Sequence, residues 1–157
     1  MQWIFWAIFV ASLLHVIEEY SFGFLDWARR IFPRLAPVIT ARRAGIINAI
    51  LLLLALIAAA LPGLPLALRL AIPSLIALNG LLHMLATIRL RRYSPGLVTG
   101  LILYLPLGVL AYVIAARTNT LTAAEAVLSV LLAIALHTVP LTWALLAARR
   151  ADSGAGG

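Results

Sequence analysis

The sequence of 157 residues has no cysteine and no lysine, and only five of its side chains are acidic. Without cysteine there can be no disulfide, no thiolate nucleophile and no thiolate metal ligand. Charged residues make up 11% of the chain and hydrophobic residues 64%, whereas globular proteins are about a quarter charged and about half apolar. With a mean hydropathy of +1.09, this composition excludes an ordinary water-soluble domain and predicts an integral membrane protein.

Apolar runs divide the chain into five predicted transmembrane helices. They cover residues 2–20, 44–61, 66–88 and 96–116, and a last run that begins at a Thr122–Glu125 capping box and ends at Arg149-Arg150. Each run approaches or exceeds the roughly 20 residues that a helix needs to cross the hydrocarbon core. The mixed apolar and basic stretch 22–36 predicts a short helix in the headgroup region.

The expected fold class is therefore all-α: a five-span transmembrane helical bundle with a short interfacial helix after the first span. Residues 1–150 form one transmembrane domain in this interpretation, and residues 151–157 form a disordered tail. Five spans take up roughly 100 positions, so no room remains for a catalytic soluble head.

All 12 basic residues are arginines, and they lie near the ends of the apolar runs. In the predicted topology ten fall on one side of the membrane, and Arg69 and Arg117 fall on the other. By the positive-inside rule the N-terminus then lies outside and the C-terminus in the cytoplasm, and we expect a bacterial inner membrane. The net charge of +7 indicates contact with membrane lipids and no binding of nucleic acid, because the arginines flank spans. The oligomeric state is left open.

Few polar side chains lie inside the predicted spans, and each costs several kcal/mol unless a partner satisfies it. All three histidines are among them: His15 in the first span, His83 in the third and His137 in the fifth. Counting from the ends of the spans at about 1.5 Å per residue places the three histidines at compatible depths in the cytoplasmic half of the membrane. In the string His15-x-x-Glu18-Glu19, the two carboxylates lie about 60° and about 40° to either side of the histidine. These groups can therefore share one layer.

Three imidazoles and two carboxylates are a ligand set suited to a divalent transition metal such as Zn, Fe or Mn. We predict metal binding by His15, Glu18, Glu19, His83 and His137, with water in an open position and Glu18 or Glu19 as the catalytic base. Two other interpretations remain. In one, the first helix ends at Glu18 and Glu19, and both carboxylates face cytoplasmic water without binding metal. In the other, each histidine makes an interhelical hydrogen bond and binds no metal.

Other polar residues fall in the same layer of the predicted bundle. Asn48 and Asn79 are expected to pack between helices or to support ligands, and Tyr104 to be structural. Gly80, next to Asn79, is expected to let another helix approach closely.

The pentad His15-x-x-Glu18-Glu19, with the later Asn79-x-x-x-His83 and His137, resembles the HXXEE-motif integral membrane protein family. The resemblance covers most of the chain and implies the same site residues. Because that family has no settled activity, the resemblance implies no particular reaction.

The expected function is a small integral membrane metal-dependent enzyme. It acts on a lipid-soluble small molecule, which enters from the cytoplasmic half of the bilayer, through the intramembrane His/Glu site. Hydrolysis, oxidation and isomerisation are all compatible with the ligand set. The alternatives are a proton or metal-ion carrier that uses the same residues, and a non-catalytic subunit of a larger membrane assembly.

Overall fold

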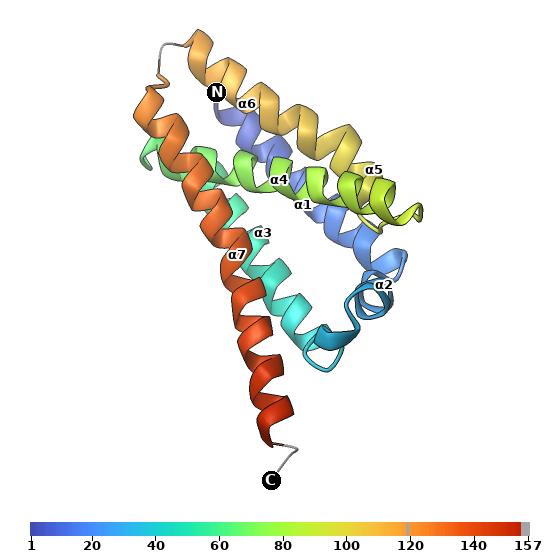
Figure 1. Cartoon of the computed structure of the whole chain (residues 1–157). Helices are drawn as coiled ribbons and strands as arrows, with labels where there is room; N and C mark the ends of the chain where they lie inside the picture. The colour runs from blue at the N-terminus through green and yellow to red at the C-terminus, as the bar shows by residue number, and fades with distance from the viewer. Residues whose placement is uncertain (119, 155–157) are drawn as a thin grey trace.

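The computed structural model describes residues 1–118 and 120–154, and this part of the chain contains helices and no strand (Figure 1). The helices are α1 (Gln2–Ser21), α2 (Phe24–Ile31), α3 (Ala41–Ala60), α4 (Leu66–Leu90), α5 (Leu97–Thr99), α6 (Leu105–Arg117) and α7 (Ala123–Gly154). A 3₁₀ turn η1 (Pro33–Leu35) follows α2, and a π-helical segment η2 (Gly100–Tyr104) joins α5 to α6.

Five helices of the described chain are long and apolar enough to cross a membrane: α1, α3, α4, the continuous helix 97–117, and α7. This confirms the all-α bundle and supports an integral membrane protein. A short helix, α2, follows the first span as expected, and its place at the membrane surface stays a prediction. Helix α7 continues beyond Arg149-Arg150 to Gly154, into the stretch where the sequence predicts a tail; residues 155–157 lie outside the described residues.

Local sequence signals set the ends of these helices. The hydroxyl of Thr40 accepts a hydrogen bond from the backbone N–H of Arg43 and so caps α3. At the start of α7, Thr122 and Glu125 make the predicted reciprocal capping box, with each side chain accepting from the other residue's backbone N–H. Helix α2 ends at Ile31, before Pro33, because the residue preceding a proline disfavours the helical conformation.

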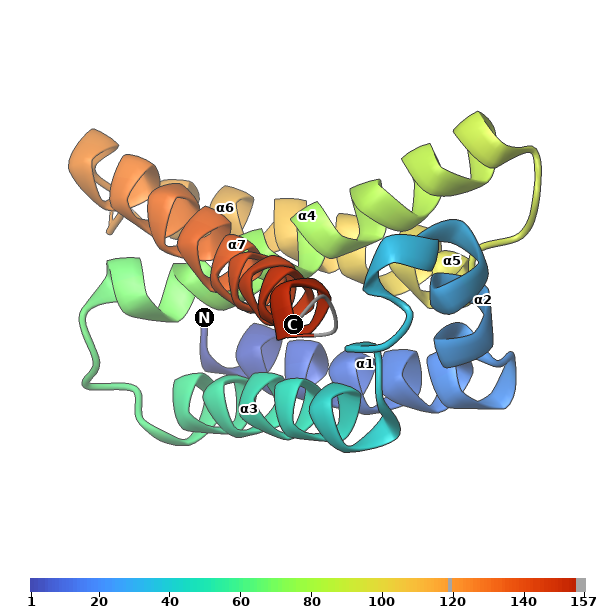
Figure 2. The ribbon, with the colours of Figure 1, turned by 60° about the horizontal axis from the view of Figure 1, so that its bottom comes forward.

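Helix α4 is central to the bundle and contacts α1, α3, α6 and α7. Helices α1 and α3 lie side by side, and α4, α6 and α7 form the other side of the molecule (Figure 2). The apolar core contains Ile4, Phe5 and Ile8 from the first half of α1, with Leu70 and Ile76 from the first two thirds of α4. These residues fill one half of the bundle, so the polar residues at the other end of α1 gather in the opposite half.

Two glycines allow α4 to approach the π-helical segment. A methyl group on Gly80 would lie 2.7 Å from the carbonyl oxygen of Gly100, closer than real Cβ atoms come. The expectation that Gly80 permits a close helix approach is therefore confirmed.

Arg69 is a buried cation at the apolar end of the bundle and is only 5% exposed. Its guanidinium donates hydrogen bonds to the carbonyl oxygens of Ala58 at 3.1 Å and Pro62 at 3.3 Å, and to the side chain of Gln2. It also lies 4.0 Å over the ring of Phe5. Arg69 thus joins α1, α3 and α4 and supplies donors to the C-terminal end of α3.

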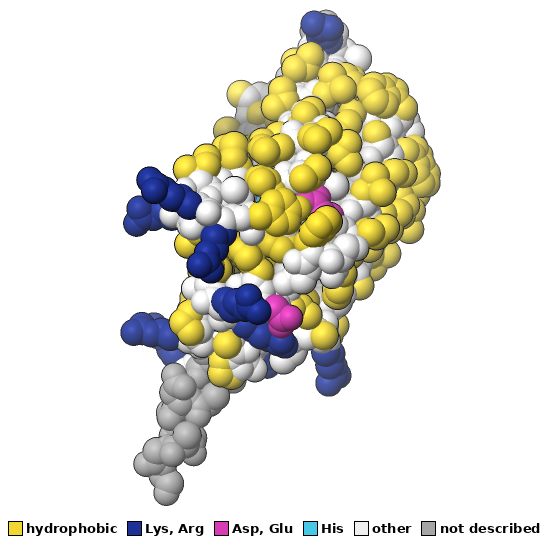
Figure 3. Space-filling view, turned by 90° about the vertical axis from the view of Figure 1, so that its right-hand side faces the viewer, with side chains coloured by type: hydrophobic (Ala, Val, Ile, Leu, Met, Phe, Trp, Pro, Cys, Tyr) yellow, Lys and Arg dark blue, Asp and Glu magenta, His cyan; other side chains and the backbone are white. Residues whose placement is uncertain are grey.

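Hydrophobic side chains cover most of the face drawn in Figure 3. The basic side chains on that face gather toward one end, with a further basic group at the opposite end. Many large apolar side chains are exposed, for example Ile102 at 66% and Val139 at 64%. Such a surface suits contact with acyl chains; the orientation of the termini stays a prediction.

Candidate metal site

Three of the five predicted ligands converge in one buried cluster. His15 and Glu19 come from α1, one helical turn apart, and His83 comes from α4. The Nε2 atom of His15 lies 3.6 Å from Oε1 of Glu19, and Nε2 of His83 lies 3.4 Å from the same oxygen. The three ligand atoms all lie within 4.8 Å of one another, and all three side chains are buried.

The opposite nitrogen of each imidazole contacts a hydroxyl group. Nδ1 of His15 lies 2.7 Å from Oγ1 of Thr99, and Nδ1 of His83 lies 2.9 Å from Oγ of Ser94. Thr99 donates its own hydroxyl hydrogen to Oε2 of Glu18 at 2.6 Å, so in the contact with His15 the imidazole is the donor. His15 therefore has a proton on Nδ1, and its Nε2 atom faces Glu19.

These residues fit a divalent transition metal. Nε2 of His15 is buried and has no hydrogen-bond partner among the described residues, a condition that native structures rarely leave uncompensated. Metal–ligand distances of about 2.0–2.2 Å separate neighbouring tetrahedral ligands by about 3.4 Å, close to the two observed N–O separations. A hydrogen bond at the second ring nitrogen fixes the orientation of a histidine ligand, and here a hydroxyl group contacts that nitrogen in both rings. Two histidines and one carboxylate occur in zinc hydrolases and in iron oxygenases.

Glu18 is also buried, but it belongs to a different structure beside the cluster. Its two oxygens accept five hydrogen bonds from the segment that leads into α5: from the backbone N–H groups of Gly96, Val98 and Thr99, and from the hydroxyls of Thr99 and Tyr93. A carboxylate offers about four lone-pair sites, so these donors saturate it. The structure thus brings Glu19, and not Glu18, to the imidazoles, while neither acid faces open water.

Through these contacts Glu18 fixes the backbone over the site. The donors lie at the start of the helix 97–117, where free N–H groups and the helix dipole favour a negative charge. Outside the predicted spans, burial and the hydrogen bond to Glu18 raise the pKa of Tyr93 to about 12. Glu18 also holds the Thr99 hydroxyl that orients His15, so it is a positioning residue for the cluster.

Gly96 closes the site between the two imidazole rings. Its φ is +101°, and a methyl group there would lie 2.7 Å from Cε1 of His15 and 2.8 Å from Cε1 of His83. Only glycine combines this conformation with this close approach. Sequence reasoning treated the residues around Gly96 as a boundary between spans and missed Tyr93, Ser94 and Thr99. A usable signal was the run of small and hydroxyl side chains next to a span at the depth of the histidines.

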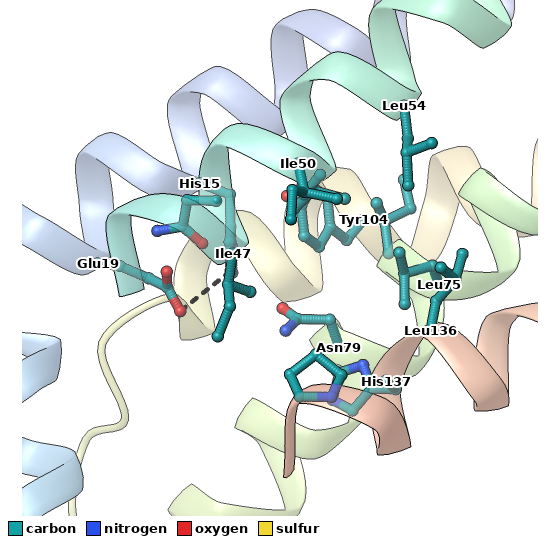
Figure 4. A pocket seen from close by; sticks show the side chains of 14 residues that line it. His15, Glu19, Ile47, Ile50, Leu54, Leu75, Asn79, Tyr104, Leu136 and His137 are labelled. Carbon is teal, nitrogen blue, oxygen red and sulfur yellow. Dashed lines mark ion pairs between the residues drawn. The ribbon is translucent and has the colours of Figure 1, made fainter. Parts of the chain in front are cut away.

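A cavity of about 140 Å³ adjoins the cluster and is lined by His15, Glu19 and His137, among other residues. In Figure 4, the ring of His137 lies beside the amide of Asn79, across the cavity from Glu19. His137 is thus near the cluster, but it is not one of the three converging ligands. The predicted five-residue site is divided into a three-ligand cluster, a positioning carboxylate and a histidine on the cavity wall.

The same cavity carries further polar atoms without partners. Oδ1 of Asn79 and the hydroxyl of Tyr104 are buried and make no hydrogen bond among the described residues, and both residues line the cavity. The ring of Tyr104, which ends η2, stacks on His15 with centroids 4.3 Å apart. Unpaired polar atoms in its lining suit the cavity to a ligand that carries a polar group.

Comparison with known sequences finds one family. Residues 6–111 match the profile described as "Protein of unknown function with HXXEE motif", and this stretch contains the His15-x-x-Glu18-Glu19 pentad and His83. No curated protein and no solved structure matches the chain.

Proposed function

The chain belongs to the HXXEE-motif family, and we propose that it is a small metal-dependent membrane enzyme that acts on a lipid-soluble substrate. His15, Glu19 and His83 hold one divalent transition metal, Zn, Fe or Mn. The observation that carries this proposal is the convergence of two imidazole Nε2 atoms on one buried oxygen of Glu19, while both Nδ1 atoms contact hydroxyls.

The other residues of the site have separate tasks in this proposal. A bound ion supplies Lewis acidity to a substrate oxygen or to water. Asn79 and Tyr104 offer polar atoms that orient the substrate in the cavity. His137 lines the cavity outside the cluster and is the group that gives or takes a proton at the substrate. Glu18 keeps His15 in the tautomer that presents Nε2 to the ion.

The shape of the bundle favours catalysis over transport. The half of the bundle next to Arg69 is filled by Ile4, Ile8, Leu70 and other side chains with at most 4% exposure. A carrier of protons or metal ions needs a polar path that continues to the other face. A cavity with a polar wall that ends against an apolar core instead suits a substrate that enters and leaves at one end.

Metal analysis of the purified protein tests the proposal. After growth with Zn, Fe and Mn, the wild-type protein is expected to retain about one ion per chain. Glu19→Gln and His83→Gln are expected to reduce the content to near zero, because each removes one of three ligands. His137→Gln is the matched control and is expected to keep the ion. Circular dichroism checks that each variant remains helical.

Two results would contradict the proposal. One is wild-type protein that retains no metal after supply of all three ions; the other is full metal content in both ligand variants. Proteoliposomes address the carrier alternative directly, since a proton or zinc flux that disappears in Glu19→Gln would favour transport over catalysis.

A further inference from the structure

We propose that the substrate is a single-chain amphiphile with an anionic head group, which binds with its head at Arg43 and its apolar chain directed toward the His15–Glu19–His83 cluster. The inference rests on the proposed function and names the substrate class of that site. It comes from a second cavity, which the sequence did not predict.

This second cavity has a volume of about 340 Å³ and lies between α2, α3 and α7, with η1 along one side. It shares lining residues with the 140 Å³ cavity, namely Glu19, Ile47, Asn48, Asn79, Leu136, His137 and Pro140. The two hollows therefore adjoin along a common wall from α1, α3, α4 and α7. A molecule in the larger cavity can reach the cluster without crossing the apolar core.

The polar groups of the larger cavity lie at its two ends. Glu19, Asn48, Asn79 and His137, which also line the smaller cavity, are at the inner end. Thr40 and Arg43 lie in the first turn of α3 or just before it. Along α3, Arg43 precedes Asn48 by five residues, which corresponds to about 7.5 Å. The remaining wall is mostly apolar, with side chains such as Phe24, Phe32, Leu35, Val38, Ile39 and Leu141. Apolar walls with few polar groups at fixed places bind amphiphiles in one orientation.

Arg43 gives the outer end of this cavity a positive charge. Its guanidinium lies 4.4 Å from the ring centroid of Trp143 and donates one hydrogen bond, at 3.1 Å, to the carbonyl oxygen of Val38. A guanidinium has five N–H donors, so most of them stay available. By contrast, Arg29 pairs with Asp26. Among the residues that line the larger cavity, the one acid is Glu19, at the inner end. The charge at the outer end thus selects an anionic head group.

The size and position of the cavity fit one apolar chain. A volume of about 340 Å³ is near the lower limit of small-molecule pockets, which favours a ligand with one apolar chain over a ligand with two. Leu141 and Trp143 line the cavity and are 51% and 52% exposed. The cavity therefore reaches the apolar surface beside α7, from which a molecule dissolved in the bilayer can enter.

Binding of radiolabelled palmitate tests the role of Arg43. The protein is placed in nanodiscs of zwitterionic lipid, and the dissociation constants of wild type, Arg43→Gln and Arg42→Gln are compared. Arg43→Gln is expected to weaken binding about tenfold or more, because charge-assisted hydrogen bonds to the head group are lost. Arg42 is exposed in the same helical turn and lines neither cavity, so Arg42→Gln is expected to bind as wild type does.

A second pair of variants tests the route of the chain. Ala144 lines the cavity, and Ala144→Phe is expected to reduce palmitate binding by filling it. Ala135 is exposed on the same helix and lines neither cavity, so Ala135→Phe is the matched control. Neutral hexadecanol is expected to bind wild type more weakly than palmitate does, and this preference is expected to disappear in Arg43→Gln.

The inference is overturned if Arg43→Gln and Ala144→Phe bind palmitate as wild type does, or if hexadecanol or a two-chain phosphatidate competes better than palmitate. Metal content measured on the same samples separates the two proposals. Metal retention without palmitate binding refutes the substrate class alone. Palmitate binding that depends on Arg43, in protein that retains no metal, refutes the proposed function and leaves the amphiphile cavity supported.

Discussion

Gly96→Ala tests the site through its backbone. The added methyl group would lie 2.7 Å from Cε1 of His15 and 2.8 Å from Cε1 of His83, in a residue whose φ is +101°. The left-handed conformation costs a non-glycine residue about 1–2 kcal/mol, and overpacking of buried side chains costs about 1–3 kcal/mol. We expect the free energy of unfolding to fall by about 2–5 kcal/mol. Metal binding should also be lost, because both rings must move away from Gly96.

Alanine variants of two other glycines separate the backbone strain from the collision with the imidazole rings. Gly23 has φ of +72° and nothing within 4 Å of an added methyl group, so Gly23→Ala carries the backbone strain alone. Gly63 has nothing within 4 Å and no positive φ, so Gly63→Ala is expected to be near neutral. The difference between Gly96→Ala and Gly23→Ala therefore measures the collision with the two imidazoles.

Unfolding in mixed detergent micelles, followed by far-ultraviolet circular dichroism, gives the free energies, and elemental analysis gives the metal content. The free energy of unfolding and the metal content should both be lower in Gly96→Ala than in the other two variants. If Gly96→Ala were no less stable than Gly23→Ala and kept its metal, the close packing of the backbone against the two rings would be refuted.

Two further predictions concern the ends of the bundle. Arg69→Met should lower the free energy of unfolding by about 2–4 kcal/mol, because carbonyl oxygens at the end of α3 lose charged donors; exposed Arg117→Met, in the same micelle assay, should change it little. The pKa of Tyr93 is raised to about 12 by burial and by Glu18, so its neutral form stabilises the fold below pH 10, and this stabilisation is lost as the pH rises through about 12. Ultraviolet titration curves of wild type and Tyr93→Phe are compared, and their difference is the phenolate signal of Tyr93. The midpoint of that signal should therefore lie well above pH 10, and a midpoint at or below 10 would contradict the Glu18 contact.

The candidate site was partly predictable from the pentad. Residues three and four apart lie on either side of a helix face, so the sequence placed both Glu18 and Glu19 beside His15 without distinguishing their roles. The structure distinguishes them by what packs on each side. The start of the helix 97–117 surrounds Glu18 with donors, while His83 approaches Glu19. No pattern within α1 contains this information.

His137 of α7 also shows what the sequence alone could not predict. Counting residues along the spans placed His137 at a depth compatible with the other two, and it does line the 140 Å³ cavity together with His15. Depth fixes one coordinate of a side chain, whereas membership of a cluster also depends on how a helix is rotated and tilted against its neighbours. The cluster of the described residues therefore contains two histidines and not three.

By itself the sequence determined the number, order and approximate bounds of the five long apolar helices. A bilayer accepts only long apolar segments that satisfy their own backbone hydrogen bonds, so runs of apolar residues with capping signals specify the spans. It also determined that buried histidine and glutamate would need partners. Tertiary structure alone decided which partners they have, because the contacts of α1 with α4 and with the Ser94–Thr99 segment join residues more than 60 positions apart and follow from helix packing.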